Sequence, residues 1–272
     1  MADADAHATD ETILTRDAAL LQDAVREAGS LAQSMFRTEL RKWTKGASSP
    51  VSEADIAVND LLEARLRSAT PDYGWLSEES ADDEVRLSRR RTWVVDPIDG
   101  TRNYLNGHDE WCVSVALVED ASPVLAAVFA PATDEFFFAA RGQGTTLNGK
   151  AVRAASGSAL DFSRVAGPKP MVERLNIAGG DIKLHPRIGS LALRLCRVAD
   201  GVLDAAFAGG NSHDWDLAAA DLIVQEADGR MSDLSGDPIL YNRREVTHGV
   251  LVAAGRDRHA GIVAHFRNRP LP

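Results

Sequence analysis

The sequence predicts a layered α/β fold with two sheets between pairs of helices. Three observations predict it: helical spacing of apolar residues at the start, short β-rich runs in the middle, and alternating helices and strands afterwards. With 272 residues, the chain suits one large unit or two closely packed subdomains. We expect a flexible tail over 1–12 and one unit over 13–272, with an N-terminal part over 13–150 and a C-terminal part over 151–272.

Two helices are expected at the start of this unit. Apolar residues from Leu14 to Leu40 recur at helical spacing and predict an amphipathic helix over roughly 14–42, which the KGASSP segment ends. Ser52, with Asp55 three residues later, resembles a capping box and predicts the start of a second helix, which runs towards Pro71. The first dozen residues are small and acidic, unlike a secretory signal.

The strands are expected from residue 73 onward. Runs rich in β-forming residues, separated by Gly, Pro or charged turns, predict neighbouring strands: WLSEE, TWVVD, CVSVALVE, VLAAVFAP and EFFFAA. Beyond the turn-rich RGQGTTLNGK, the expected elements are strand RVAGP, a helix near 190–200, strand VLDAAFA, a helix near 215–227 and strand GVLVAAG.

Composition narrows the classes of partner. The net charge is −10 and no long Lys/Arg stripe occurs, which argues against nucleic acid, and no apolar run is long enough for a membrane span. Cys112 and Cys196 lie in apolar segments and make no disulfide framework, so we expect a cytoplasmic protein. Arg86 and Arg89–Arg91 follow Asp82, Asp83 and Glu84 in a charge run that predicts a solvated loop.

The most informative segment runs from Trp93 to Tyr104. An apolar strand ends at Asp96, Pro97 holds the backbone extended and Gly100 permits a tight turn, so Asp96 and Asp99 can converge on one point. Mg²⁺ prefers such carboxylates together with water, phosphate or a backbone carbonyl such as that of Ile98. The N–H groups of Gly100 and Thr101 would face phosphate oxygens if they open a helix. An isolated D-x-x-D is more typical of a turn that caps a helix.

The extended motif DPIDGTRNY resembles the signature of the inositol monophosphatase superfamily, D-P-[IL]-D-G-T-x-N-[FY]. Upstream, Glu78-Glu79-Ser80 resembles the E-E-S segment of that family. Downstream, the segment from Trp215 through Asp216 to Ala227 is similar to W-D-x-A-A-G…E-A-G-G, with Ala220 and Asp228 departing from the pattern. A weaker likeness covers Lys45–Asp55, where Asp55 would help to hold a third metal ion or serve only as the capping-box partner of Ser52.

The resemblance implies an αβαβα sandwich of the inositol monophosphatase and sugar phosphatase type, two or three Mg²⁺ ions, a small phosphorylated substrate and a homodimer. The metal ligands carried over are Glu78, Asp96, Ile98 through its carbonyl, Asp99 and Asp216. Glu78 and Thr101 would orient a metal-activated water that attacks phosphorus in line, with no phosphoenzyme. No zinc-ligand spacing, G-x-S-x-G elbow or GxxxxGK[ST] loop offers a competing chemistry.

The substrate follows less directly. Inositol monophosphatases usually carry a carboxylate seven residues before the motif Asp, and here that position is Gly209. The segment from Gly189 and Ser190 through Arg194 to Gly201 resembles the bacterial bisphosphate nucleotidase pattern S-L-K-x-C-x-V-A-E-G. We therefore expect a 3'(2'),5'-bisphosphate nucleotidase whose substrate contacts Asp99, Gly189, Ser190, Arg194 and Asp216. The alternatives are an inositol-1-monophosphatase, a histidinol-phosphatase, a regulatory family member that acts through a partner, and an Arg194 that merely faces solvent.

Overall fold

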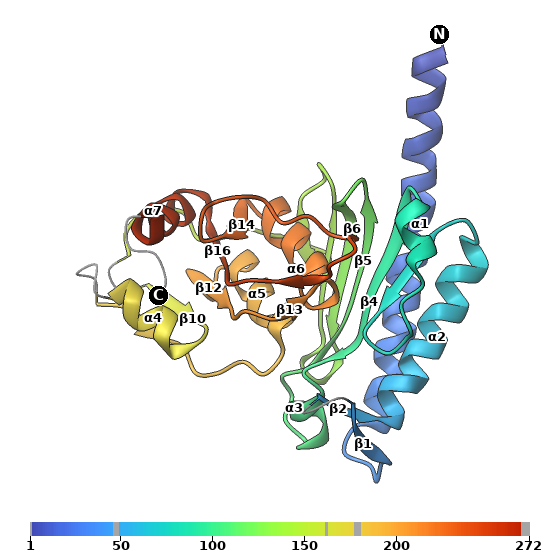
Figure 1. Ribbon diagram of the computed structural model, residues 1–272, viewed down its shortest axis with the longest axis horizontal. Coiled ribbons are helices and arrows are strands. Elements are labelled where there is room, and N and C mark those ends of the chain that lie inside the picture. The colour runs from blue at the N-terminus through green and yellow to red at the C-terminus, as the bar shows by residue number, and fades with distance from the viewer. Residues whose placement is uncertain (1, 46–48, 161–162, 177–180, 268–272) are drawn as a thin grey trace.

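The computed structural model describes residues 2–45, 49–160, 163–176 and 181–267, with side chains from residue 12 onward. Two sheets alternate with three layers of helices, as Figure 1 shows. The layered α/β architecture predicted from the sequence is confirmed. In the described residues, no helix is both long and apolar enough to cross a membrane.

The first layer contains α1 (Ala2–Met35) and α2 (Glu53–Ala69), which pack side by side against one face of the larger sheet. Helix α1 already includes 2–12, which were expected to be a flexible tail, because no Gly or Pro interrupts them. It ends before 42, since Arg37 takes a left-handed backbone with φ 61°. A hairpin not expected from the sequence, β1 (Lys42–Lys45) and β2 (Ser49–Ser52), joins the helices.

The larger sheet has seven strands in chain order, and all but the first pair run antiparallel. Its strands are β3 (Gly74–Ser77), β4 (Arg91–Asp99), β5 (Cys112–Glu119), β6 (Ser122–Ala130), β7 (Glu135–Ala140), β8 (Thr145–Leu147) and β9 (Lys150–Val152). Helices cover both faces, which explains why β4, β5 and β6 are almost continuously buried. Asn148 and Gly149, both with positive φ, make the two-residue turn of the last hairpin.

The middle layer contains α5 (Leu191–Ala199) and α6 (Asp214–Glu226) between the sheets. Both helices were predicted, within one or two residues at each end. The row Ala218-Ala219-Ala220 on α6 is buried and lets the helix approach both sheets closely. This layer therefore fixes how the two sheets sit relative to each other.

The second sheet has five strands in the order β11-β10-β12-β16-β14. They are β10 (Arg164–Ala166), β11 (Lys183–Leu184), β12 (Ala205–Ala208), β14 (Gly229–Asp233) and β16 (Leu251–Gly255). Two helices that were not predicted, α4 (Lys169–Asn176) and α7 (Arg256–Arg267), form the outer layer. The short elements are α3 (Thr101–Leu105), β13 (Ser212–His213), β15 (Thr247–His248) and the 3₁₀ turns η1 (Glu84–Ser88) and η2 (Pro131–Thr133).

The expected solvated loop at the charge run is partly wrong. Arg86 and Arg91 are only 2% and 5% exposed. Burial is tolerated because Arg86 pairs with Asp82, and Arg91 with Glu119 at 2.6 Å. Both cysteines are buried free thiols.

Candidate metal centre

Two of the acidic side chains come from the end of β4. The pairing of β4 with β5 shifts register between Asp96 and Asp99, so the chain bulges where both carboxylates lie. The Ile98 N–H donates to Asp96 Oδ1 at 3.1 Å. Gly100 then takes a φ of 93°, and a side chain there would meet the Glu110 carbonyl at 3.0 Å. Strand and turn together explain why the two carboxylates converge.

The third carboxylate comes from the second half of the chain. Asp216 lies in the first turn of α6 and accepts from the His213 N–H at 2.6 Å, which closes the helix N-terminus. Asp96, Asp99 and Asp216 each offer a carboxylate oxygen, and these atoms lie within 4.8 Å of one another. We call these three residues the carboxylate trio.

Asp99 also joins the trio to α5. Its Oδ2 accepts from Ser190 Oγ at 2.5 Å and from the Ala192 N–H at 2.6 Å, at the start of that helix. Gly189 is needed just before it, because a side chain there would collide with Asn103 of the signature segment. The structure thus brings the predicted substrate residues Gly189 and Ser190 beside Asp99.

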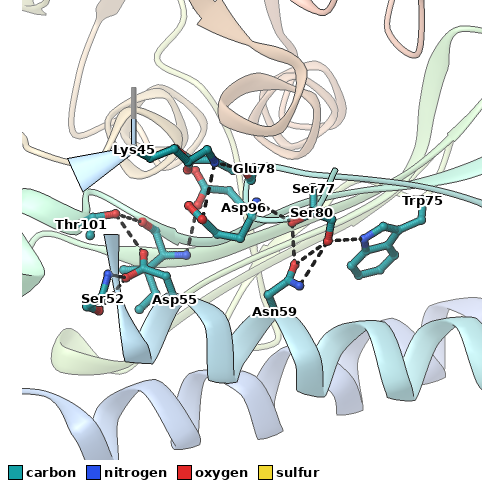
Figure 2. Close-up of polar contacts among 12 residues, drawn as sticks. Lys45, Ser52, Asp55, Asn59, Trp75, Ser77, Glu78, Ser80, Asp96 and Thr101 are labelled. Carbon is teal, nitrogen blue, oxygen red and sulfur yellow. Dashed lines mark hydrogen bonds and ion pairs between the residues drawn. The ribbon is translucent and has the colours of Figure 1, made fainter. Parts of the chain in front are cut away.

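Glu78 and Glu79 follow β3, next to the end of β4. Figure 2 shows Glu78, Asp96 and Lys45 meeting on one side of the site. Lys45, on the β1–β2 hairpin, donates to the Glu78 carbonyl and lies 3.5 Å from Glu79 Oε2. Lys45 thus forms an ion pair with Glu79, and its charge also acts on the nearby Glu78 carboxyl group.

The turn that carries Glu78 is fixed by residues not singled out in the sequence. Asn59 on α2 accepts from Ser77 Oγ at 2.7 Å and donates to Ser80 Oγ at 3.2 Å, as Figure 2 shows. The Trp75 indole N–H also donates to Ser80, at 3.1 Å. Ser80 stands in the matched E-E-S segment, but only the packing of α2 against β3 and β4 reveals Asn59.

Of the two roles that the sequence left open for Asp55, the structure shows the capping box, and the third metal ion stays a prediction. Its Oδ2 closes the capping box of α2 by accepting from the Ser52 N–H at 2.8 Å and from Ser52 Oγ at 2.6 Å. Its Oδ1 lies 3.1 Å from Thr101 Oγ1, which is also 3.0 Å from the Ile98 carbonyl oxygen. One hydroxyl proton can serve only one of these acceptors at a time. Asp55 therefore connects α2 to the turn after β4.

The buried carboxyl groups raise one another's pKa through their negative charges. Burial, and then the charges of Asp216 and Glu79, raise the pKa of Glu78 to about 8. Burial and Asp216 raise the pKa of Asp99 to about 6, although the bonds from Ser190 and Ala192 oppose that rise. The pKa of Asp96 is raised well above its ordinary value by burial and by Glu78 and Asp99. A cation would relieve this crowding of negative charge, and an all-oxygen donor set suits Mg²⁺.

A basic cavity of about 410 Å³ opens near this centre. Arg194, Arg187, Lys169 and His185 line it, together with Gly167. Arg194 is half-buried, and its buried Nε has no hydrogen-bond partner among the described residues. Burial and Arg187 lower its pKa, while Asp99 opposes that shift. Arg194 is therefore not a fully exposed helix residue, and its contact with substrate stays a prediction. Gly209 contributes no side chain, as expected, and lies against Pro168.

Comparison with known proteins agrees with this arrangement. The profile of the "Inositol monophosphatase family" matches residues 14–271. The chain is 36% identical over 231 residues to "Nus factor SuhB" of Xylella fastidiosa, covering 80% of this chain and 82% of that protein. It is 34% identical over 237 residues to "Inositol monophosphatase 2" of Solanum lycopersicum, covering 82% and 89%.

A third relative is "3'(2'),5'-bisphosphate nucleotidase CysQ" of Aggregatibacter actinomycetemcomitans, which is 31% identical over 248 residues and covers 83% and 88% of the two chains. Among solved structures, extragenic suppressor protein suhB from Bartonella henselae superposes with a TM-score of 0.81 at 26% identity, covering 93% of this chain and 98% of that one. Together with the signature segment and the carboxylate trio, these matches show that the chain belongs to the inositol monophosphatase family of metal-dependent phosphomonoesterases.

Proposed function

We propose that this phosphatase is a 3'(2'),5'-bisphosphate nucleotidase that works with two or three Mg²⁺ ions. The residues that would hold the ions are the carboxylate trio, Glu78 and the carbonyl of Ile98. Bound Mg²⁺ supplies positive charge for the phosphate oxygens and the departing oxygen, and lowers the pKa of water. The donor chemistry supports the assignment of Mg²⁺, because carboxylate and carbonyl oxygens are the ligands that this ion prefers.

The protein groups would position the reactants around that charge. The Glu78 carboxylate, on the turn after β3 beside Asp96, can accept a proton from the attacking water. The Thr101 hydroxyl, held between Asp55 and the Ile98 carbonyl, can orient that water. The backbone N–H groups of Gly100 and Thr101 would bind the phosphate. Since a water serves as the nucleophile, no phosphoenzyme forms.

The basic cavity carries the substrate assignment. A bisphosphate has a second dianion, and Arg194 with Arg187 and Lys169 would offer charge-assisted donors for it in the cavity that they line, with Arg194 close enough to Asp99 to feel its charge. Gly189, which is partly exposed, would line the path between the two phosphates, whereas Ser190 is fully buried and would act through its hydrogen bond to Asp99. An inositol ring would need hydroxyl acceptors, and Gly209 provides no carboxylate.

Two other functions have support of their own. The family profile and the tomato relative favour an inositol-1-monophosphatase, and a histidinol-phosphatase would use the same ligands. The relative named as a Nus factor favours a regulatory protein that binds a partner. We propose the enzyme as a cytoplasmic homodimer, which sedimentation velocity would test.

The substrate is tested by phosphate release from a panel of esters at matched concentration. The wild type should prefer the bisphosphate nucleotide over inositol 1-phosphate. A phosphate ion pair contributes about 1.5–3 kcal/mol, so Arg194→Ala should lower kcat/KM for the bisphosphate about tenfold or more and leave a nucleoside monophosphate nearly unchanged. Arg153→Ala, at an exposed arginine outside the cavity, is the control.

Preference for inositol 1-phosphate, or equal loss on both nucleotides in Arg194→Ala, would contradict the nucleotidase assignment and leave the phosphatase intact. Absence of Mg²⁺-dependent release from every ester would instead favour the regulatory function.

A further inference from the structure

A strap over residues 241–248 holds the helix that carries Asp216. In Figure 1 the chain between β14 and β16 crosses from the smaller sheet towards the larger one and returns. Asp214, fully buried and two residues before Asp216, accepts from the Asn242 N–H at 2.7 Å and lies 2.6 Å from His248 Nε2. The Tyr241 hydroxyl donates to Asp221 on the same helix at 2.9 Å. The strap is therefore hydrogen-bonded to α6 at two residues, Asp214 and Asp221.

The side chain of Asn242 also forms hydrogen bonds to the larger sheet and to Arg86. Its Oδ1 accepts from Arg86 Nη1 at 2.8 Å and its Nδ2 donates to Thr92 Oγ1 at 3.0 Å. Thr92 belongs to β4, the strand that ends in Asp96 and Asp99. Asn242 has a φ of 53°, a left-handed conformation that Asn tolerates better than most residues. One residue thus bonds α6 through its backbone and β4 through its side chain.

Arg86 extends this contact to the segment that follows Glu78. Its guanidinium binds both Asp82 oxygens, at 2.7 and 2.9 Å, and the Arg243 carbonyl at 3.1 Å. Gly74 makes room for it, because a side chain there would lie 2.5 Å from Thr92 Oγ1 and 2.9 Å from Arg86 Cβ. Asp82 lies four residues after Glu78. All three segments that carry the proposed metal ligands therefore meet at Asn242.

We infer that Asn242 is a positioning residue that sets the distance between Asp216 and the ligands on the larger sheet. This inference rests on the proposed metal centre. The trio combines one residue from α6 with two from β4, and metal sites require their ligands to be held within about 0.5 Å. Asn242 touches none of the ligands, so its effect must pass through the placement of α6 relative to β4.

The test measures the direct binding of Mn²⁺ to the protein. Calorimetry and the electron paramagnetic resonance signal of the free ion both report the Kd. Asn242→Gly removes both side-chain bonds and keeps the left-handed backbone accessible. Loss of a residue that supports metal ligands typically weakens affinity 10–100-fold, and Asn242 lies one step further out, so we expect the Kd for Mn²⁺ to rise about threefold to tenfold. Turnover at saturating Mn²⁺ should recover.

The matched control is Asn148→Gly. Asn148 also has positive φ and two side-chain hydrogen bonds, but these join only Asp134 and Phe136. A second variant, Thr92→Val, removes the acceptor on β4 without a change of shape, and should also weaken Mn²⁺ binding. In the double variant, Asn242→Gly with Thr92→Val, the Kd for Mn²⁺ should rise by less than the product of the two separate fold-changes.

Equal Mn²⁺ affinities in Asn242→Gly and Asn148→Gly, whatever their melting temperatures, would overturn the inference. So would a Thr92→Val protein that binds Mn²⁺ like the wild type. Failure of the wild type itself to bind Mn²⁺ is a different result, because it would contradict the proposed metal centre.

Discussion

The carboxylate trio meets at the end of β4, and Glu78 is close enough to interact electrostatically with it. Burial and mutual repulsion raise the pKa of Asp96, Asp99 and Glu78, so ionisation of these carboxyl groups without a nearby cation disfavours the folded state. The convergence of Asp96 and Asp99 follows from the sequence, because one bulged strand end carries both. The addition of Asp216 depends on how α6 docks, and was expected only from the family resemblance.

Asp96→Asn, Asp99→Asn and Asp216→Asn should each lower turnover at least about a hundredfold, because each removes charge from a proposed ligand. The variants should stay folded, since amides relieve the repulsion. Phosphate release across a Mg²⁺ titration checks the first expectation, and thermal unfolding with and without Mg²⁺ checks the second. Near-normal turnover at saturating Mg²⁺ in any variant would remove that residue from the ligand set.

The neighbouring glutamates should behave differently. Glu78→Gln should lower kcat far more than KM, because Glu78 is proposed to act on the nucleophile rather than on substrate binding. Glu79→Gln should have the smaller effect, since Glu79 pairs with Lys45. Steady-state kinetics on both variants compare them, and equal losses would mean that both bind metal or that the wrong glutamate was chosen.

At the scale of elements, the starts of α2, α5 and α6 were predicted well, whereas α1 begins at Ala2 rather than near 14. Ser52 and Asp55 form the expected capping box of α2, and α5 and α6 begin near their expected positions. Helix α7 was missed because its RDRHAGIVAHFR sequence carries charges among few apolar residues, and its burial comes from packing on the second sheet. Strands of two residues, such as β13 and β15, exist only through their partners and have no local signal.

The capping box offers a way to separate the role of Asp55 in capping α2 from its contact with Thr101. Ser52→Ala and Asp55→Ala both weaken the cap and should each cost about 1 kcal/mol of unfolding free energy from that cause. Only Asp55→Ala also removes the acceptor beside Thr101, so only this change should lower kcat. Urea unfolding matched with steady-state kinetics tests the pair. The same kcat in both proteins would limit Asp55 to capping.

At the scale of the whole molecule, the layer order was predicted, whereas the division into parts at residue 150 stays a prediction. Stability should also depend on pH through His259, a buried residue on α7 that lies 2.9 Å from Ser232 Oγ. Burial, and then Arg230, lower its pKa from 6.5 to about 4. Between these values the unfolded chain binds a proton that the folded chain does not, so stability falls as pH falls through this window.

At pH 5, protonation of His259 in the unfolded chain lowers the free energy of unfolding by about 2 kcal/mol. The raised pKa values of Glu78 and Asp99 act in the opposite direction, so the measurement is a difference between proteins. From pH 7 to 5, His259→Gln should lose about 2 kcal/mol less unfolding free energy than the wild type in urea titrations with EDTA. Parallel pH profiles would show that His259 does not titrate in this window.

The split of the carboxylate trio between β4 and α6 also predicts an order of events during folding. Asp96 and Asp99 can come together once β4 pairs with β5, but Asp216 joins them only after α6 has docked between the sheets. A partly folded chain with only the first sheet in place lacks the third carboxylate. We therefore expect divalent ions that bind the trio to stabilise the folded protein by mass action and to slow its unfolding, with little effect on the rate of folding.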